Sequence, residues 1–168
     1  MFHTSRFNQL TQAIPRHTFN KSVAKAQADR YAKKTKCWDL LMLLTYGHLH
    51  QVSSLRQLVQ EYSAQDPFLY HLGSKPLKRS TVSDALAKRS DEPFRVLCEA
   101  LLGQVARSQR KELKEVVCAI DSTPIKLPNP RFSSWTEGNQ TPRCKGLKVH
   151  VASNLDTALP FYARITDP

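Results

Sequence analysis

The sequence predicts an α+β protein in which an amino-terminal bundle of helices is followed by three strands of a β-meander. Apolar residues recur at helical spacing up to about residue 111, whereas after Val116 they cluster in short β-branched runs or alternate. The charge balance shifts at the same place. Residues 1–114 carry 19 basic and 9 acidic side chains, and residues 115–168 carry 6 and 5. We therefore expect two parts, a basic helical region at 1–112 and a strand region at 113–168.

Two short helices separated by Pro15 are expected first, followed by a central buried helix over residues 37–49, where apolar residues are densest. The expected apolar positions of these helices are Phe7, Leu10, Ile14, Phe19, Val23, Trp38, Leu41, Leu44 and Leu49. A fourth helix follows, with Ser53 or Ser54 as its N-cap. Its inward residues repeat at i, i+3, i+4 and i+7, namely Leu55, Leu58, Val59 and Tyr62.

A turn-rich stretch precedes a short helix in RSTVSDALAKRS, where Thr81 and Asp84 form a T-x-x-D start. The residues expected to face inward are Val82, Ala85 and Leu86. The longest helix is predicted from about Pro93 to Lys111, with an apolar stripe at Phe94, Leu97, Cys98, Leu101, Leu102 and Val105. We interpret Cys98 and Cys118 as core thiols, because both lie inside apolar runs. None of the four cysteines forms a CxxC pair or has a His at finger spacing, so a zinc site is not expected.

The short helix is our candidate for entering a major groove, with its early residues reading base edges and nearby cations contacting phosphates. The expected DNA-binding residues are Lys75, Lys78, Arg79, Ser80, Thr81, Ser83, Lys88 and Arg89. A net charge of +11 favours a polyanionic partner. The alternative is an ordinary surface helix with solvated charges, and the turn before it is longer than a standard helix-turn-helix allows.

Asp121 follows the apolar run VVCAI, which is typical of a strand covered on both faces. A carboxylate at the end of such a strand needs an offset for its desolvation, which a metal ion, an N-cap or a turn within DSTP could supply. Glu137, Asp156 and Asp167 are the acids that remain downstream, and the last two are interpreted as turn residues. Two further strands are expected, in KGLKVHVASN and PFYARIT.

The ordered segments AIDSTPIKL, FSSWTEGN and KGLKVHVASNLDTALPFYARITD resemble the start of the catalytic domain of bacterial DDE-type insertion-sequence transposases. The upstream segments FNQLTQAIPRHTF, QADRY, SSLRQLV and YHLGSKPLKRSTVSDALAKR resemble the helical amino-terminal region of the same family. The resemblance implies an incomplete RNase H-like domain over residues 113–168, with its first three strands. It implies that Asp121 is the first catalytic, metal-binding acid. Ser122, Thr123, Lys148 and His150 would be active-site neighbours.

The same resemblance implies Mg²⁺ or Mn²⁺ in the complete enzyme, which cuts phosphodiester bonds at element ends and transfers strands. It places the second Asp and the Glu beyond Pro168, so we expect this chain to hold no metal stably and to bind DNA without cutting it. The alternatives are an intact enzyme using Asp121, Asp156 and Asp167, and a non-catalytic DNA- or RNA-binding regulator that interferes with full-length transposase. A third alternative is a basic RNA- or ribosome-associated binding protein.

Further expectations concern partners and location. Double-stranded DNA is the expected partner, with self-association or pairing with full-length transposase. The chain shows no signal peptide or membrane span, which favours a cytoplasmic, nucleoid-associated protein. We also expect the strand region to be held more loosely than the helical region.

Overall fold

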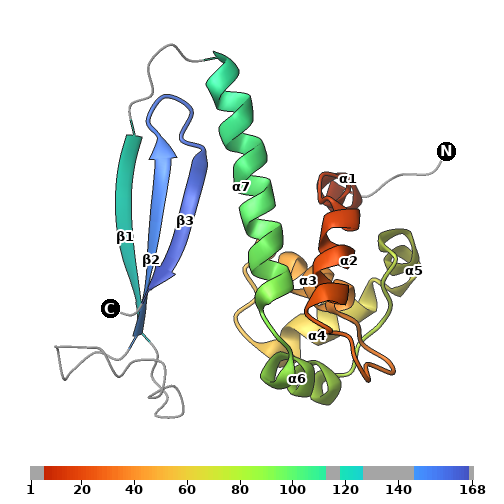
Figure 1. Cartoon of the computed structure of the whole chain (residues 1–168). Coiled ribbons are helices and arrows are strands. Elements are labelled where there is room, and N and C mark those ends of the chain that lie inside the picture. Colours follow the sequence, from red (N-terminus) through yellow and green to blue (C-terminus); the bar gives the residue numbers. More distant parts are fainter. Residues whose placement is uncertain (1–5, 113–117, 127–145, 167–168) are drawn as a thin grey trace. The chain divides into compact units, whose positions relative to one another are not determined.

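The computed structural model describes residues 6–112, 118–126 and 146–166, and Figure 1 shows them as coloured ribbons. The chain divides into two compact units, Met1–Leu97 and Cys98–Pro168, which are described separately. The elements in chain order are α1 (Arg6–Gln12), α2 (Arg16–Lys25), α3 (Cys37–Leu49), α4 (Leu55–Ala64), α5 (Asp66–Leu69), a 3₁₀ helix (Tyr70–Leu72), α6 (Arg79–Lys88), α7 (Glu92–Glu112), β1 (Cys118–Lys126), β2 (Gly146–Asn154) and β3 (Pro160–Thr166). Helices followed by an antiparallel sheet confirm the predicted α+β class.

Helix α3 is the central helix of the first unit, as predicted. Its buried face is shifted from the expected one, because Leu44 and Leu49 are 40% and 49% exposed. Leu10 of α1 is also exposed, and Phe7 instead packs edge-on against Tyr46 with ring centroids 5.8 Å apart. The buried residues of α3 are Cys37, Trp38, Asp39, Leu40, Met42, Leu43, Tyr46 and Gly47.

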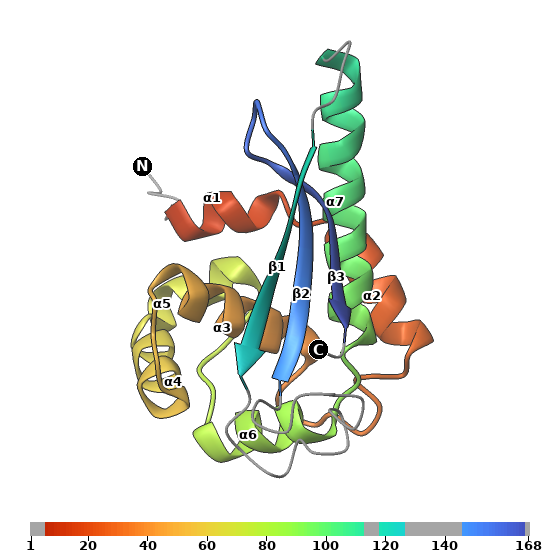
Figure 2. The ribbon, with the colours of Figure 1, turned by 90° about the vertical axis from the view of Figure 1, so that its left-hand side faces the viewer.

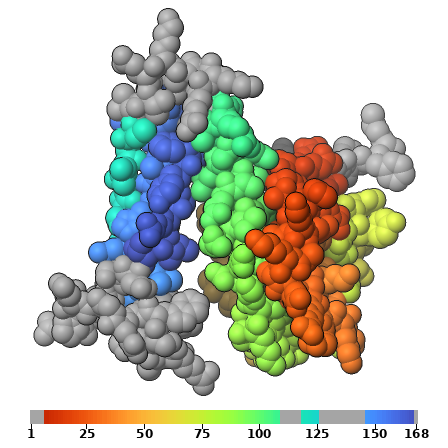
Figure 3. Space-filling model, in the orientation of Figure 1, coloured from red at the N-terminus to blue at the C-terminus, as the bar shows by residue number. Residues whose placement is uncertain are grey.

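Phe19 joins three helices of this unit. It is fully buried and meets Trp38 of α3 and Phe94 of α7 edge-on, at centroid distances of 5.9 and 5.6 Å. Edge-to-face pairs add stability beyond the area they bury. Helix α2 and the start of α7 consequently lie side by side, and Figure 3 shows their surfaces in contact.

Helix α4 packs on α3 where a glycine allows close approach. A Cβ on Gly47 would lie 2.8 Å from Leu58 Cδ1, so a larger residue would force the Leu58 side chain to move. The predicted cap at Ser54 is confirmed, because its hydroxyl accepts the Gln57 N–H at 3.2 Å. Leu58, Val59 and Tyr62 are buried as expected.

A buried polar network links α3, α4 and the segment after the 3₁₀ helix. The Tyr62 hydroxyl and the Ser74 hydroxyl lie 2.9 Å apart, and Ser74 donates to Asp39 Oδ1 at 2.9 Å. The other Asp39 oxygen accepts the Lys36 N–H at 2.8 Å, so this buried carboxylate is fully engaged. Burial raises the pKa of Tyr62 to about 12.

The three strands form an antiparallel meander in the order β1-β2-β3, which Figure 2 shows face-on. Asn154 ends β2 and organises the turn to β3. Its side-chain oxygen accepts the backbone N–H groups of Asp156 and Thr157 at 2.8 and 3.2 Å. The backbone N–H of Asn154 donates to the Leu159 carbonyl at 3.1 Å. The predicted position of Asp156 in a turn is confirmed.

Two predictions about burial in the second unit are wrong. Cys98 and Cys118 are exposed rather than in a core. Ile120 is 79% exposed, so β1 is not covered on both faces by the described residues. Within those residues, no helix has both the length and the apolar character that a membrane crossing requires.

Candidate nucleic-acid interface and acidic strand

Helix α6 presents a polar, cationic surface and is anchored by two small apolar residues. Val82 and Ala85 are buried as predicted, whereas Leu86 is 42% exposed. The predicted DNA-binding residues that are exposed are Lys75, Lys78, Arg79, Ser80, Ser83 and Lys88, and Thr81 is half-buried. Asp84 is an exposed acid on the same helix. The exposed cations on and just before this helix are Lys75, Lys78, Arg79 and Lys88.

The predicted capping box at the start of α6 is wrong, although the helix opens with Arg79 as expected. The helix begins at Arg79, with Lys78 as an N-cap that makes no side-chain hydrogen bond, so Thr81 and Asp84 do not form a capping box. The segment before it is fixed to α4, since Ser63 Oγ accepts the Leu77 N–H at 3.1 Å. The first turn of α6 therefore carries two cations beside N–H groups that no side chain of its N-cap satisfies, which suits an anion.

Arg89 lies in a different environment from the exposed cations of α6. Its guanidinium pairs with Asp29 at 3.4 Å and donates to the Thr35 carbonyl, and its side chain is only 13% exposed. Asp29 also accepts the Cys37 N–H at 2.8 Å. Arg89 thus connects the end of α6 to the segment between α2 and α3, and its charge is engaged within the chain.

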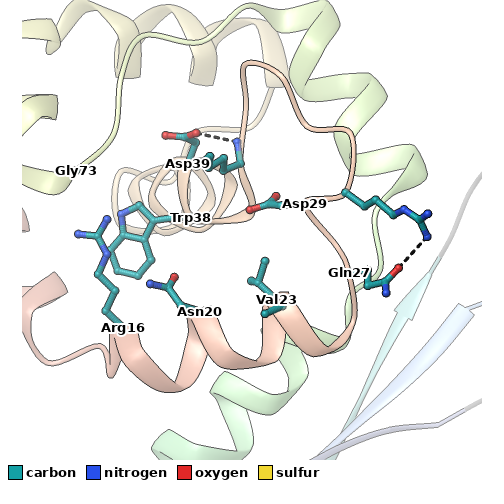
Figure 4. Close-up of a pocket in the computed structure, with 11 residues that line it drawn as sticks. Arg16, Asn20, Val23, Gln27, Asp29, Trp38, Asp39 and Gly73 are labelled. Carbon is teal, nitrogen blue, oxygen red and sulfur yellow. Dashed lines mark hydrogen bonds between the residues drawn. The ribbon is translucent and has the colours of Figure 1, made fainter.

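Two hollows border the segment between α2 and α3. Figure 4 shows the first, where Arg16 lies over the ring of Trp38 at 4.5 Å and Asn20 and Asp29 line the walls. The second is lined by this segment together with α6. The stretch QADRY of this segment carries part of the family resemblance, but no binding role was predicted for it or for the charged run AKKTK that follows.

Asp121 lies in the middle of β1 and not after its end. The strand extends through the DSTP residues, so the alternative of a DSTP turn is wrong. The carboxylate is exposed, and it accepts the Ser122 N–H at 2.7 Å and the Thr123 hydroxyl at 3.4 Å. Exposure removes the desolvation cost on which the sequence argument for a metal depended.

The strand register separates the predicted active-site neighbours into two groups. Asp121 is paired with Val151 and Thr123 with Val149, so these side chains share one face of the sheet. Ser122 is paired with His150, and Pro124 with Lys148, so Ser122, Lys148 and His150 belong to the opposite face. His150 Nε2 lies 2.8 Å from Thr166 Oγ1 on that face.

The described residues do not provide a metal centre. No group of three His, Cys, Asp or Glu side chains converges within residues 6–108, 118–125 and 146–166. Glu137 and Asp167 lie outside the described residues, and Asp156 is in the turn after β2. Asp121 alone does not fit a two-metal site, which needs several carboxylates.

Two family models match parts of this chain. Residues 3–75 match the model of a domain of unknown function (DUF4372), and residues 112–168 match the model described as the transposase DDE domain. The chain is 34% identical over 103 residues to a Sinorhizobium fredii protein named "Putative transposase y4zB". The match covers 61% of this chain but 26% of that protein, so the chain spans about a quarter of its relative. No solved structure matches the chain.

The family resemblance drawn from AIDSTPIKL and KGLKVHVASN is therefore confirmed for the C-terminal part. Asp121, Lys148 and His150 all fall within the matched region. Residues 112–168 of this chain are therefore similar to the transposase DDE domain family.

Proposed function

We propose that the helical region binds double-stranded DNA through α6 and so brings a DDE transposase domain to the ends of an insertion element. The observation that carries this proposal is the exposed cationic row around the first turn of α6. Lys78 and Arg79 lie at the turn itself, Lys75 precedes it, and Lys88 lies at the far end of the helix. Cations beside a helix N-terminus bind phosphate groups and fix the register of a protein on the duplex.

Ser80 and Ser83 are the exposed hydroxyls of this surface, and short hydroxyl side chains can contact base edges in a major groove. Arg89 is excluded from the contact set because Asp29 and Thr35 hold it. Asp84 lies on the same helix and would be repelled by phosphates, so we leave it out of the proposed duplex contact.

Fluorescence anisotropy with a labelled element-end duplex tests the DNA proposal. The Lys78→Gln/Arg79→Gln variant should weaken binding about tenfold or more and flatten the salt dependence by roughly two phosphate contacts. Lys21→Gln/Lys25→Gln, which removes two exposed charges from α2, is the matched control. Equal affinity and equal salt slope for the Lys78→Gln/Arg79→Gln variant and the control would overturn the assignment to α6.

We infer that Asp121 is one ligand of the divalent metal ions that DDE transposases use, and that the other acids come from outside the described residues. Thr123 shares the face of Asp121 and can orient the carboxylate through its hydroxyl. Asp121 also has apolar neighbours on that face, so a covering layer would exclude water from it. When bound, the metals would stabilise the entering and leaving oxygens of a phosphodiester displacement.

We expect the 168-residue chain neither to nick nor to join element-end DNA, because its described residues bring no further acids to Asp121 where the chemistry needs several carboxylates. A nicking assay with Mg²⁺ or Mn²⁺ measures this. Robust cleavage that disappears in Asp121→Ala would show that an acid set including Asp121 is complete in this chain. In this proposal the protein acts at the nucleoid, alone or paired with another transposase subunit.

A further inference from the structure

The segment joining α2 to α3, residues 26–36, has an exposed aromatic ring among several cations; we refer to it as the α2–α3 loop. Tyr31 is 84% exposed, which is unusual for so large an apolar ring. The exposed cations of the loop are Arg30, Lys33, Lys34 and Lys36. An aromatic ring surrounded by lysine and arginine is typical of surfaces that bind nucleic acid strands.

The backbone of the loop holds this ring in a costly conformation. Tyr31 has φ +63° and Gln27 has φ +49°, in the left-handed region that bulky residues rarely adopt. The Arg30 guanidinium lies 5.0 Å from the centre of the Tyr31 ring and donates to Gln27 Oε1 at 3.0 Å. The hydrogen bond is marked in Figure 4 beside the label of Gln27. Strain of this kind persists where the surrounding structure fixes it, and it is frequent at binding sites.

The surrounding structure does fix the loop, and it does so through α6. Asp29 near the middle of the loop pairs with Arg89, and Arg89 also donates to Thr35 near the end of the loop. Asp29 further accepts the Cys37 N–H at the start of α3. The loop and the C-terminal end of α6 therefore form one rigid surface.

A groove of about 760 Å³ lies between the loop and α6. Its walls include Arg30, Tyr31, Lys33 and Lys34 from the loop, and Lys88 with Thr81 and Asp84 from α6. The Arg89–Asp29 pair is neutral, so four positive charges face one carboxylate, that of Asp84. Lys88 belongs both to this groove and to the α6 surface proposed to bind duplex DNA, so the two surfaces are continuous.

We propose that this groove is a second DNA contact, in which the lysines follow the backbone of a strand and Tyr31 stacks on an unpaired base. The inference rests on the proposed function of α6 and extends it to DNA that is partly unpaired beside the duplex. An aromatic ring can stack on any base, but in an intact duplex the base faces are covered by their neighbours. The groove therefore favours duplex DNA with a single-stranded extension over a blunt duplex.

Anisotropy with two probes, a blunt element-end duplex and the same duplex with a short single-stranded extension, tests this contact. Tyr31→Gly is the main variant, because glycine suits the positive φ and removes only the ring. It should reduce affinity for the extended probe about tenfold and leave affinity for the blunt duplex unchanged. Tyr31→Phe keeps the ring and should behave like the parent chain. Lys33→Gln/Lys34→Gln should flatten the salt dependence on the extended probe only.

The outcomes separate this contact from the one proposed for α6. Equal effects of Tyr31→Gly on both probes, or no effect on either, would overturn the groove contact while a loss in Lys78→Gln/Arg79→Gln still supports α6. The converse pattern is a loss of binding in Tyr31→Gly but none in Lys78→Gln/Arg79→Gln. It would support the groove contact and overturn the contact proposed for α6. Tighter binding of structured RNA than of the extended DNA at matched salt would overturn the choice of DNA.

Discussion

The pair formed by Arg89 and Asp29 gives the sharpest test of how the helical unit is built. Arg89→Met keeps most of the apolar stem and removes the charge and its hydrogen bonds. Breaking a fully buried ion pair costs about 3–5 kcal/mol, and breaking an exposed one costs about 0–1 kcal/mol. The two side chains are 13% and 26% exposed, and Asp29 keeps its bond to the Cys37 N–H. We therefore expect the free energy of unfolding to fall by about 1.5–3 kcal/mol, between these limits.

Urea unfolding followed by far-ultraviolet circular dichroism measures this change, because the signal comes mainly from the helices. A double-mutant cycle with Asp29→Asn isolates the pair and should give a coupling of roughly 1–2 kcal/mol. Lys88→Met removes the neighbouring exposed cation and should change stability by less than about 0.5 kcal/mol. Unchanged stability in Arg89→Met, together with weakened DNA binding, would refute this reasoning and make Arg89 a phosphate contact.

Three further predictions concern two glycines, the buried thiol of Cys37 with the buried phenol of Tyr62, and the sheet. Gly73→Ala should lower the free energy of unfolding by about 1–2 kcal/mol, because Gly73 has φ +63°. Gly103→Ala should raise it by about 0.5–1 kcal/mol, because Gly103 lies in a helix with open space where a Cβ would lie. Urea titration measures both changes. Burial chiefly raises the pKa of Cys37 and of Tyr62 to about 12, so the native state keeps protons that the unfolded state loses from about pH 9. Stability should then fall by up to about 1.4 kcal/mol per pH unit for each group, between pH 9 and 12 for Cys37 and between pH 10 and 12 for Tyr62, and Cys37→Ala should remove the first step. Hydrogen exchange should protect the strands less than the helices, and Ile120→Thr should reduce aggregation, whereas equal strong protection in both regions would contradict the prediction.

The helices that the sequence predicted best are those with long, regular apolar patterns. Helix α7 was expected from about Pro93 to Lys111 and runs over Glu92–Glu112, because its stripe spans several turns. The cap at Ser54 was also predictable, since a serine directly before an apolar repeat satisfies a free N–H of the first turn. In both cases the information lies within a few residues of the feature.

Local patterns failed where distant residues decide the outcome. The T-x-x-D pattern at Thr81 looked like a cap, but Leu77 is fixed by Ser63 on α4 and the N-cap of the helix is Lys78. Arg89 resembled its exposed neighbours in sequence, and only the fold brings it to Asp29, sixty positions earlier.

The acidic strand shows the same limit. The polar run after Ile120 suggested that the strand ended there, yet pairing with β2 continues through Asp121 to Lys126. A ladder of nine pairs overrides the turn preference of Asp, Ser and Pro. The sequence could identify Asp121 through its family pattern, but it could not show that Lys148 and His150 lie on the other face of the sheet.

The turn organised by Asn154 sets the order in which the sheet can form. Strands β2 and β3 are joined by residues 155–159 alone, and the amide oxygen of Asn154 closes that turn with bonds inside it. Strands β1 and β2 are separated in sequence by residues 127–145, so pairing them costs more loop-closure entropy than pairing β2 with β3. The β2–β3 hairpin can thus assemble as a local nucleus in microseconds, and β1, which carries Asp121, is added to it later.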